Sequence, residues 1–128
     1  MRVWSPYRRL GLCFLLTATE LTSVVARADD HPLRGVALVI GESDYDQLKD
    51  LGNPKRDARA MDDLLDKLGF DVSRVLDGNA DKLRREIADF VDEAKDADVA
   101  LVYYSGHGIE ADGSDYLVPT DTDLSSPK

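Results

Sequence analysis

The chain has 128 residues, of which 43% are hydrophobic and 32% are charged, and its formal net charge is −9. This length fits one compact domain, and the composition is that of a globular protein rather than a disordered or membrane-embedded one. Residues 1–28 hold four arginines and one glutamate, so the hundred residues that follow carry a net charge of −12. A domain this acidic repels phosphate groups, and we therefore expect no nucleic-acid partner.

The N-terminal segment has the features of an export signal. Arginines at positions 2, 8 and 9 precede the apolar run Leu10–Ala18, and Ala26 and Ala28 provide small residues at −3 and −1 of a cleavage point. This order is typical of a secretory signal peptide, and the run is about half the ~20 residues of a membrane-spanning helix. A buried N-terminal helix is the alternative. We expect residues 1–28 to be removed, no membrane span, and export of the domain 29–128 to the periplasm or the extracellular space.

The first half of the domain is predicted to contain a strand and a helix. Val36–Ile40 is a continuous apolar run that ends at Gly41, which is typical of a strand buried on both faces. A helix is expected to begin with Asn53 as N-cap and Pro54 at its first position, and to stop at Gly69. Its apolar residues recur at helical spacing: Ala58, Met61, Leu64, Leu65 and Leu68.

A second strand over Phe70–Leu76, a third over Val99–Tyr104 and a hairpin turn at Asp112-Gly113 follow. Between the two strands, apolar positions are spaced as on one face of an amphipathic helix: Leu83, Ile87, Phe90, Val91 and Ala94. This order predicts an α/β fold with a mainly parallel sheet and helices on both faces. Residues 119–128 add no further core element, so we expect the domain to be incomplete at its C-terminus.

Two segments are expected at the carboxyl ends of the strands, where α/β sheets place their sites. They are Gly41–Asp46, after the first strand, and Ser105–Gly108, after the third. His107 lies between two glycines there, and an imidazole in this place can act as a general acid or base near neutral pH. A histidine that packs or caps at the strand end is the alternative.

Five segments form a series along the chain: Val36–Gly41, Asn53–Ala58, Leu68–Phe70, Ala100–Gly108 and Tyr116–Asp121. The series resembles the large-subunit half of the caspase and metacaspase family of cysteine peptidases, and bacterial caspase-like domains in particular. The strand that runs into Ser-Gly-His-Gly is its most distinctive part. The resemblance implies a caspase-like three-layer α/β sandwich and a cysteine-type endopeptidase that acts on peptide or protein substrates.

The resemblance also implies roles for four residues. His107 matches the catalytic histidine, and the backbone N–H of Gly108 matches half of an oxyanion hole. Asp57 and Ser105 match positions that line the metacaspase pocket for a basic P1 side chain, where a carboxylate pairs with Arg or Lys. The residues alone leave Asp57 open as a first-turn helix acid and Ser105 as a strand-end hydroxyl. The acidic residues of the first-strand loop are expected to favour the same basic P1: Glu42, Asp44, Asp46 and Asp50.

One departure from the family concerns the nucleophile. The family's cysteine follows the next strand, usually in an Asp-x-Cys sequence, and residues 1–128 do not include it. Cys13 is the sole cysteine and lies in the segment that we expect to be removed. The chain by itself is therefore predicted to be an inactive portion of a longer peptidase. A non-catalytic caspase-like interaction module is the alternative.

Acidic residues near the C-terminus raise the question of calcium: Asp112, Asp115, Asp121 and Asp123. Their spacing does not match an EF-hand loop, so solvated acidic loops explain them better. Some metacaspases use calcium, but those ligand positions cannot be matched to this sequence. We expect no metal and no cofactor, and the sequence gives no indication of the oligomeric state.

Overall fold

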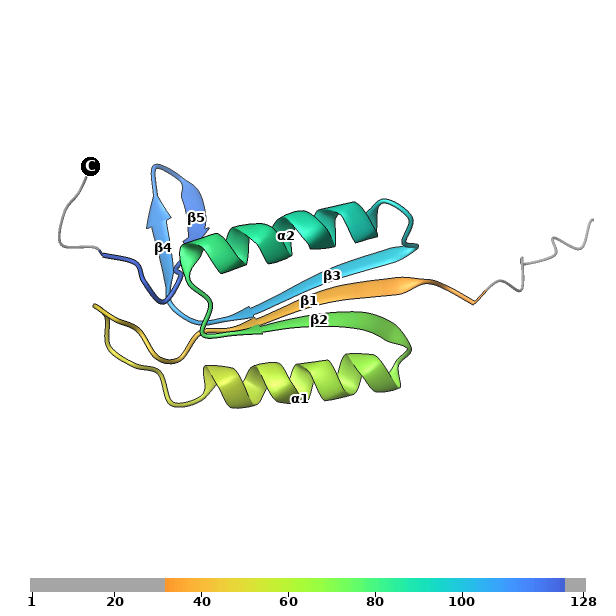
Figure 1. Cartoon of the computed structure of the whole chain (residues 1–128), viewed down its shortest axis with the longest axis horizontal. Helices are drawn as coiled ribbons and strands as arrows, with labels where there is room; N and C mark the ends of the chain where they lie inside the picture. The colour runs from red at the N-terminus through yellow and green to blue at the C-terminus, as the bar shows by residue number, and fades with distance from the viewer. Residues whose placement is uncertain (1–31, 124–128) are drawn as a thin grey trace, which may run out of the picture. The chain divides into compact units, whose positions relative to one another are not determined.

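The computed structural model describes residues 32–123 (Figure 1). The predicted signal peptide, Cys13 and residues 124–128 lie outside the described residues. The described elements follow the predicted order, and the three long strands lie within one residue of the expected ranges. The elements are β1 (Gly35–Gly41), α1 (Pro54–Lys67), β2 (Phe70–Leu76), α2 (Ala80–Ala94), β3 (Val99–Ser105), β4 (Gly108–Ala111) and β5 (Ser114–Leu117).

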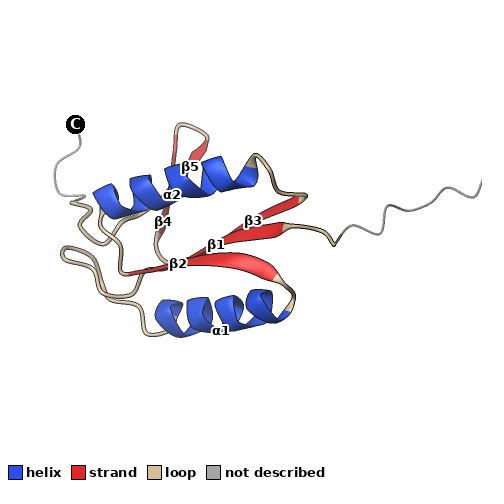
Figure 2. Cartoon of the chain, turned by 45° about the vertical axis from the view of Figure 1, so that its right-hand side comes forward, coloured by secondary structure: helices blue, strands red, loops and turns tan. Residues whose placement is uncertain are grey.

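The three long strands form a parallel sheet in the order β2-β1-β3. Gly41 pairs with Leu76 on one side and with Ser105 on the other, so the three strands end level with one another. The two helices cover opposite faces of this sheet (Figures 1 and 2). Connections between parallel strands are right-handed, and the connection from β1 to β2 runs in the opposite direction along the sheet to the connection from β2 to β3. The two connections therefore place their helices on opposite faces. The predicted α/β fold is confirmed, and β4 and β5 form the separate antiparallel hairpin that was expected.

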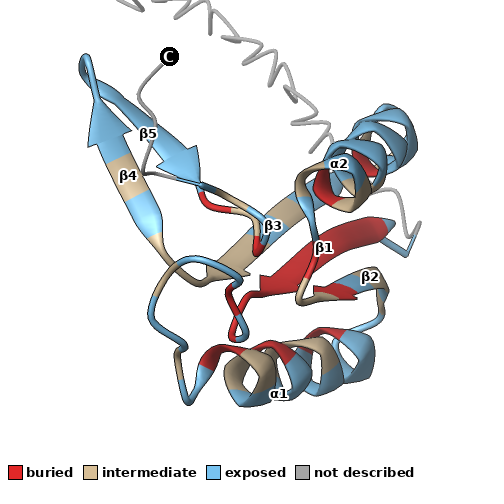
Figure 3. Cartoon of the chain, turned by 60° about the vertical axis from the view of Figure 1, so that its left-hand side comes forward, coloured by how far each residue is buried: buried red, intermediate tan, exposed pale blue. Residues whose placement is uncertain are grey.

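The core is built around β1, whose seven residues are all buried (Figure 3). On one face, Leu38 and Ile40 belong to a cluster with Leu83 and Phe90 of α2. On the other face, Ala37 and Val39 pack with Ala58 and Leu65 of α1. Burial of one such aliphatic side chain stabilises the fold by roughly 1.5–3 kcal/mol, so β1 and its two helix contacts hold the domain together. The continuous apolar run predicts this central strand correctly.

The apolar face of α2 extends beyond the sheet beneath it. Leu83 and Phe90 are buried, whereas Ile87 and Val91 are 38% and 52% exposed. The reason is that α2 packs mainly on β1 and β2, whereas β3 has little contact with it. Val102 on β3 is likewise 53% exposed. Helical periodicity identifies an apolar face correctly, but it does not show which strand lies below it.

The helix ends differ in one detail from the prediction. α1 begins at Pro54 as expected, but the Asn53 side chain makes no capping hydrogen bond. Ser43 Oγ accepts the Lys55 N–H at 3.2 Å instead, which ties the start of α1 to the loop after β1. Gly69 has φ +86°, and this left-handed conformation ends α1 as predicted. Neither helix within residues 32–123 has the length and apolar character that crossing a membrane requires.

Candidate active site

Loops from four parts of the chain meet at the carboxyl edge of the sheet. We call residues 41–53, 77–79, 105–107 and 118–122 the carboxyl-edge loops. Backbone hydrogen bonds join them: Glu42 N to Ser105 O at 2.8 Å, Asp46 N to Thr120 O at 2.9 Å, Asp77 N to Gly41 O at 3.1 Å and Thr120 N to Gly78 O at 3.1 Å. The level ends of the three strands bring these loops together, so a side chain on one loop is positioned by the others.

The peptide groups on both sides of His107 are held by two tyrosines. The His107 N–H donates to Tyr45 Oη at 2.8 Å, and the tyrosine and imidazole ring centroids are 4.7 Å apart. The His107 carbonyl accepts from Tyr104 Oη at 2.6 Å and from Val118 N at 3.2 Å. Burial holds the pKa of the Tyr104 hydroxyl above its ordinary value, so that hydroxyl remains a donor. The backbone at His107 is therefore fixed from both directions.

The imidazole of His107 is oriented by a backbone carbonyl. Its Nε2 lies 2.8 Å from Lys49 O. Because a carbonyl oxygen can only accept, Nε2 must carry the hydrogen in this contact. Nδ1 is then the nitrogen that bears the lone pair in the neutral ring. This arrangement gives His107 the form of a general base in which one nitrogen is anchored and the other can take up and return a proton.

The glycines around His107 have different roles. A Cβ at Gly106 would lie 2.5 Å from Tyr104 Oη and 2.8 Å from Tyr45 Oη. Gly106 is therefore required for both hydroxyls to reach the His107 peptide. Gly108 begins β4 and is exposed, and a Cβ there would meet nothing closer than Tyr116 O at 3.8 Å. Its backbone is accessible, and its part in an oxyanion hole stays a prediction.

The two predicted pocket residues lie at the same edge of the sheet but are not joined. Ser105 ends β3, is half-buried, and stands two residues before His107. Asp57 lies in the first turn of α1, where its N–H donates to Asn53 O and its carboxylate is 3.7 Å from Arg56 Nε. Across residues 32–123, no hydrogen bond or ion pair links Asp57 to Ser105 or His107. Their common pocket therefore stays a prediction.

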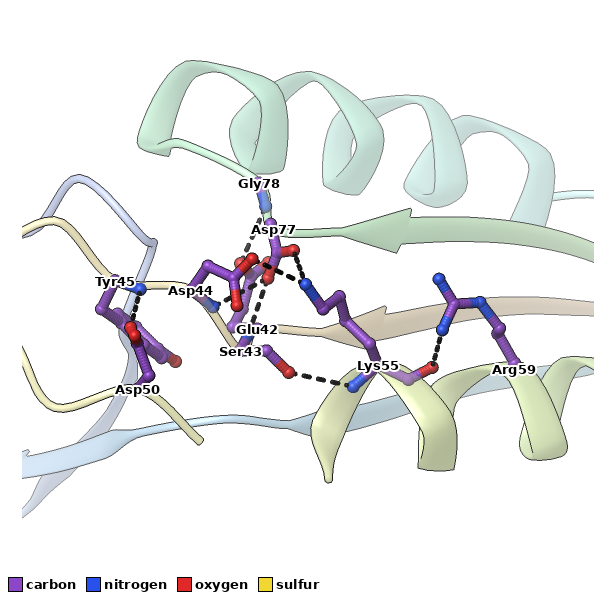
Figure 4. A network of polar contacts seen from close by, with 9 residues as sticks. All are labelled: Glu42, Ser43, Asp44, Tyr45, Asp50, Lys55, Arg59, Asp77 and Gly78. Atoms are coloured by element: carbon purple, nitrogen blue, oxygen red, sulfur yellow. Dashed lines mark hydrogen bonds and ion pairs between the residues drawn. The ribbon is translucent and has the colours of Figure 1, made fainter. Parts of the chain in front are cut away.

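A polar network fixes the loop after β1 to the start of α1 (Figure 4). Asp77 has φ +47° and accepts the N–H groups of Ser43 at 2.8 Å and Asp44 at 3.1 Å. Lys55 Nζ lies 2.7 Å from Asp44 Oδ2 and 2.8 Å from Asp77 Oδ2. Partial burial alone would raise the pKa of Asp77, but the Lys55 ammonium and the two N–H donors hold it below its ordinary value. Asp77 is therefore ionised and anchors this loop.

The prediction that the acidic residues of the loop after β1 all face a basic P1 side chain is wrong for Glu42. Glu42 has an exposed fraction of 0%, so it does not face a substrate. The charge of Asp44 lies beside that of Lys55, and Asp50 accepts the Tyr45 N–H at 2.9 Å. These acidic side chains contact groups of the same loop and of neighbouring segments, which the sequence does not reveal. The loop therefore offers fewer free acidic side chains than the sequence predicts.

No group of three or more His, Cys, Asp or Glu side chains in the described part of the chain is placed to hold a metal ion. Asp121 Oδ1 instead accepts the Ala80 N–H at 2.8 Å, at the start of α2. Asp112 has φ +52° at the turn of the hairpin, and Asp115 lies on β5. Three of the four acidic residues considered for calcium, Asp112, Asp115 and Asp121, thus lie in different local structures.

The residues that hold His107 carry little signal in the sequence. Tyr45 lies in a polar loop, and Tyr104 lies in an apolar strand in which an aromatic residue is ordinary. Asp77 before Gly78 indicates a turn but not a bond to the loop after β1. A signal for the tyrosines exists in Gly106, because a glycine directly before the histidine leaves room for a close contact.

Comparisons with known proteins point to one family. A family model described as the caspase domain matches residues 34–127. The human mucosa-associated lymphoid tissue lymphoma translocation protein 1 is 34% identical over 94 residues, which are 72% of this chain and 11% of that protein. The mouse homolog of that protein is 33% identical over 86 residues, or 67% of this chain and 10% of its own length. The chain therefore spans about a tenth of the curated relatives that it matches.

Proposed function

The chain belongs to the caspase family, and from that premise we propose that it is the histidine-bearing part of a cysteine-type endopeptidase. The observation that carries the proposal is the setting of His107. Its imidazole is anchored through Nε2 to Lys49 O, and its peptide group is held by Tyr45. Proton transfer requires an imidazole that is held in one orientation, whereas the packing of the core does not require one.

The reaction follows from this geometry. Neutral His107 takes the proton of a cysteine thiol at Nδ1, and the thiolate attacks the scissile carbonyl to form a tetrahedral intermediate. The N–H of Gly108 stabilises the negative oxygen of that intermediate. His107 then returns its proton to the departing amine, which leaves a thioester that water hydrolyses. The thiol is supplied by polypeptide outside residues 1–128, and the isolated chain is inactive.

The free edge of the described sheet supports this arrangement. β3 has no neighbour on its outer side within residues 32–123, and its Val99 and Val102 side chains are 41% and 53% exposed. A further parallel strand paired with β3 would end level with Ser105, since parallel strands in this sheet end together. A cysteine at that end would lie near His107. Side chains of that strand would lie beside Val99 and Val102 on the two faces of the sheet and shield part of this apolar surface from water.

Asp57 and Ser105 support a basic P1 preference, and the arginine-rich N-terminal segment supports export from the cytoplasm before the enzyme acts. A second function, a non-catalytic interaction module, is favoured by the open apolar surface of Ile87, Val91 and Val102. The peptidase requires a cysteine thiol beside His107, whereas the interaction module does not.

The test compares residues 1–128 with a form extended by the polypeptide encoded downstream. We expect no cleavage of an Arg-containing peptide reporter by residues 1–128, and cleavage by the extended form if it supplies the cysteine. Replacement of that cysteine by alanine in the extended form is the control. Activity of residues 1–128 that survives Cys13→Ser would contradict the proposed nucleophile, and an extended form without a suitable cysteine would favour the interaction module.

Asp57→Asn in the active extended form is expected to lower the preference for Arg over a neutral P1 residue by about tenfold, equivalent to about 1.4 kcal/mol. The effect is modest because the Asp57 side chain is 42% exposed and water screens its charge. The measurement is the ratio of kcat/KM for two reporters that differ at P1. Asp63→Asn, an exposed acid on the same helix, is the matched control. A parental ratio in Asp57→Asn would show that Asp57 acts as a helix-start acid.

A further inference from the structure

Glu42 is a buried carboxyl group that the proposed reaction does not use. It directly follows β1 and has an exposed fraction of 0%. Its Oε2 accepts the Gly78 N–H at 2.7 Å, whereas its Oε1 is buried and has no hydrogen-bond partner within the described part of the chain (Figure 4). A buried oxygen without a partner is costly when charged and much less so when the carboxyl group is neutral.

The charged groups around Glu42 also favour its neutral form. Asp77 faces it from the loop before α2 and Asp121 from the segment after β5, while Lys82 on α2 provides a positive charge. Tyr104, on β3, is a further titratable neighbour. Burial raises the pKa of Glu42 to about 7; Asp77 and Asp121 add to this rise, and the Gly78 N–H and Lys82 oppose it.

Glu42 lies where the loops that hold His107 are joined. Its N–H donates to Ser105 O, two residues before His107. Its side chain binds Gly78, whose carbonyl accepts the Thr120 N–H at 3.1 Å. Thr120 lies two residues after Val118, and the Val118 N–H donates to the His107 carbonyl. A negative charge on Glu42 would repel Asp77 and Asp121, which lie on either side of this connection.

We propose that Glu42 is a positioning residue: in its protonated form it keeps the carboxyl-edge loops closed around His107, and its ionisation loosens them. The site is then most ordered at mildly acidic pH. The inference rests on the proposed function for the importance of His107, but the ordering of the loops exists without any peptidase activity. A failure of the proposed role of Glu42 can therefore be distinguished from a failure of the proposed peptidase function.

The test is amide hydrogen exchange on the full chain, residues 1–128, at pH 6 and pH 8, corrected for intrinsic exchange rates. In the wild type, protection of the Gly78, Thr120 and His107 amides is expected to fall by about tenfold between these pH values, relative to the amides of β1. Glu42→Gln keeps an oxygen for the Gly78 N–H and has no charge to gain. In this variant, the protection of the same three amides is expected to be equal at both pH values.

Glu93→Gln removes an exposed carboxyl group from α2 and is the matched control, with the wild-type response expected. Equal protection of the three amides at pH 6 and pH 8 in the wild type would overturn the inference, whether or not Glu42→Gln folds. A Glu42→Gln variant that loses as much protection as the wild type would overturn it as well. In an active extended form, we expect kcat/KM of the wild type to fall above about pH 7, and we expect Glu42→Gln to remove this fall.

Discussion

His107→Ala is expected to lower kcat/KM by at least about 100-fold in a form of the protein that includes the cysteine. In the proposed mechanism, the free nitrogen of the imidazole activates the thiol and returns the proton to the leaving amine. The contact of Nε2 with Lys49 O orients the ring, and the hydrogen bond from the His107 N–H to Tyr45 Oη holds the backbone beneath it. An alanine keeps the backbone contacts but has no group that can transfer a proton.

The measurement is steady-state cleavage of a peptide reporter, with thermal unfolding of both proteins to show that the variant remains folded. His31→Ala is the matched control, because it removes the other histidine of the chain and should leave kcat/KM unchanged. If His107→Ala were folded and retained activity within a fewfold of the parent, His107 would be a packing residue, and the proposed mechanism would be wrong.

The fold was predictable because its signals are local. The apolar run of β1 indicates a strand buried on both faces, and Gly69 with φ +86° ends α1 where a glycine is needed. The hairpin turn at Asp112-Gly113 has positive φ at both residues, as the residue pair suggests. The exposure of Ile87 and Val91 was not predictable in the same way. It depends on which strand lies beneath α2, and strand order is a property of the whole sheet.

The candidate site was predictable in part for the same reason. His107 between glycines at the end of a strand indicates a site, and the structure brings Ser105, His107 and Gly108 to one edge of the sheet. The partner of the imidazole, Lys49 O, lies 58 residues earlier in the chain. Its contact depends on how the loop after β1 folds back, which no local pattern encodes. The same loop turns Glu42 inward, although Asp44 and Asp46, two and four residues further along, are exposed.

Glu42 should make the free energy of unfolding depend on pH between about 4.5 and 7. Its pKa is about 7 in the folded chain, against an ordinary value of 4.5, so between these values the folded state binds more protons than the unfolded state. The free energy of unfolding therefore falls as the pH rises through this range, by about 3 kcal/mol in total. Asp77 acts in the opposite direction: its lowered pKa stabilises the fold above its ordinary value of 3.8, and this contribution is lost as the pH falls.

The contribution of Glu42 is isolated by comparing urea unfolding of the wild type and Glu42→Gln at several pH values from 4.5 to 8. The wild type should lose about 3 kcal/mol relative to the variant over this range, with similar denaturant slopes in both proteins. The variant should become the more stable protein toward pH 8, because an amide remains neutral beside Asp77 and Asp121, whereas a carboxylate does not. Glu93→Gln should follow the wild type. Parallel curves for the wild type and Glu42→Gln would mean that the Glu42 carboxyl group gains its charge without cost, through water or a movement of the loop, and the pH response of the site would then need another source.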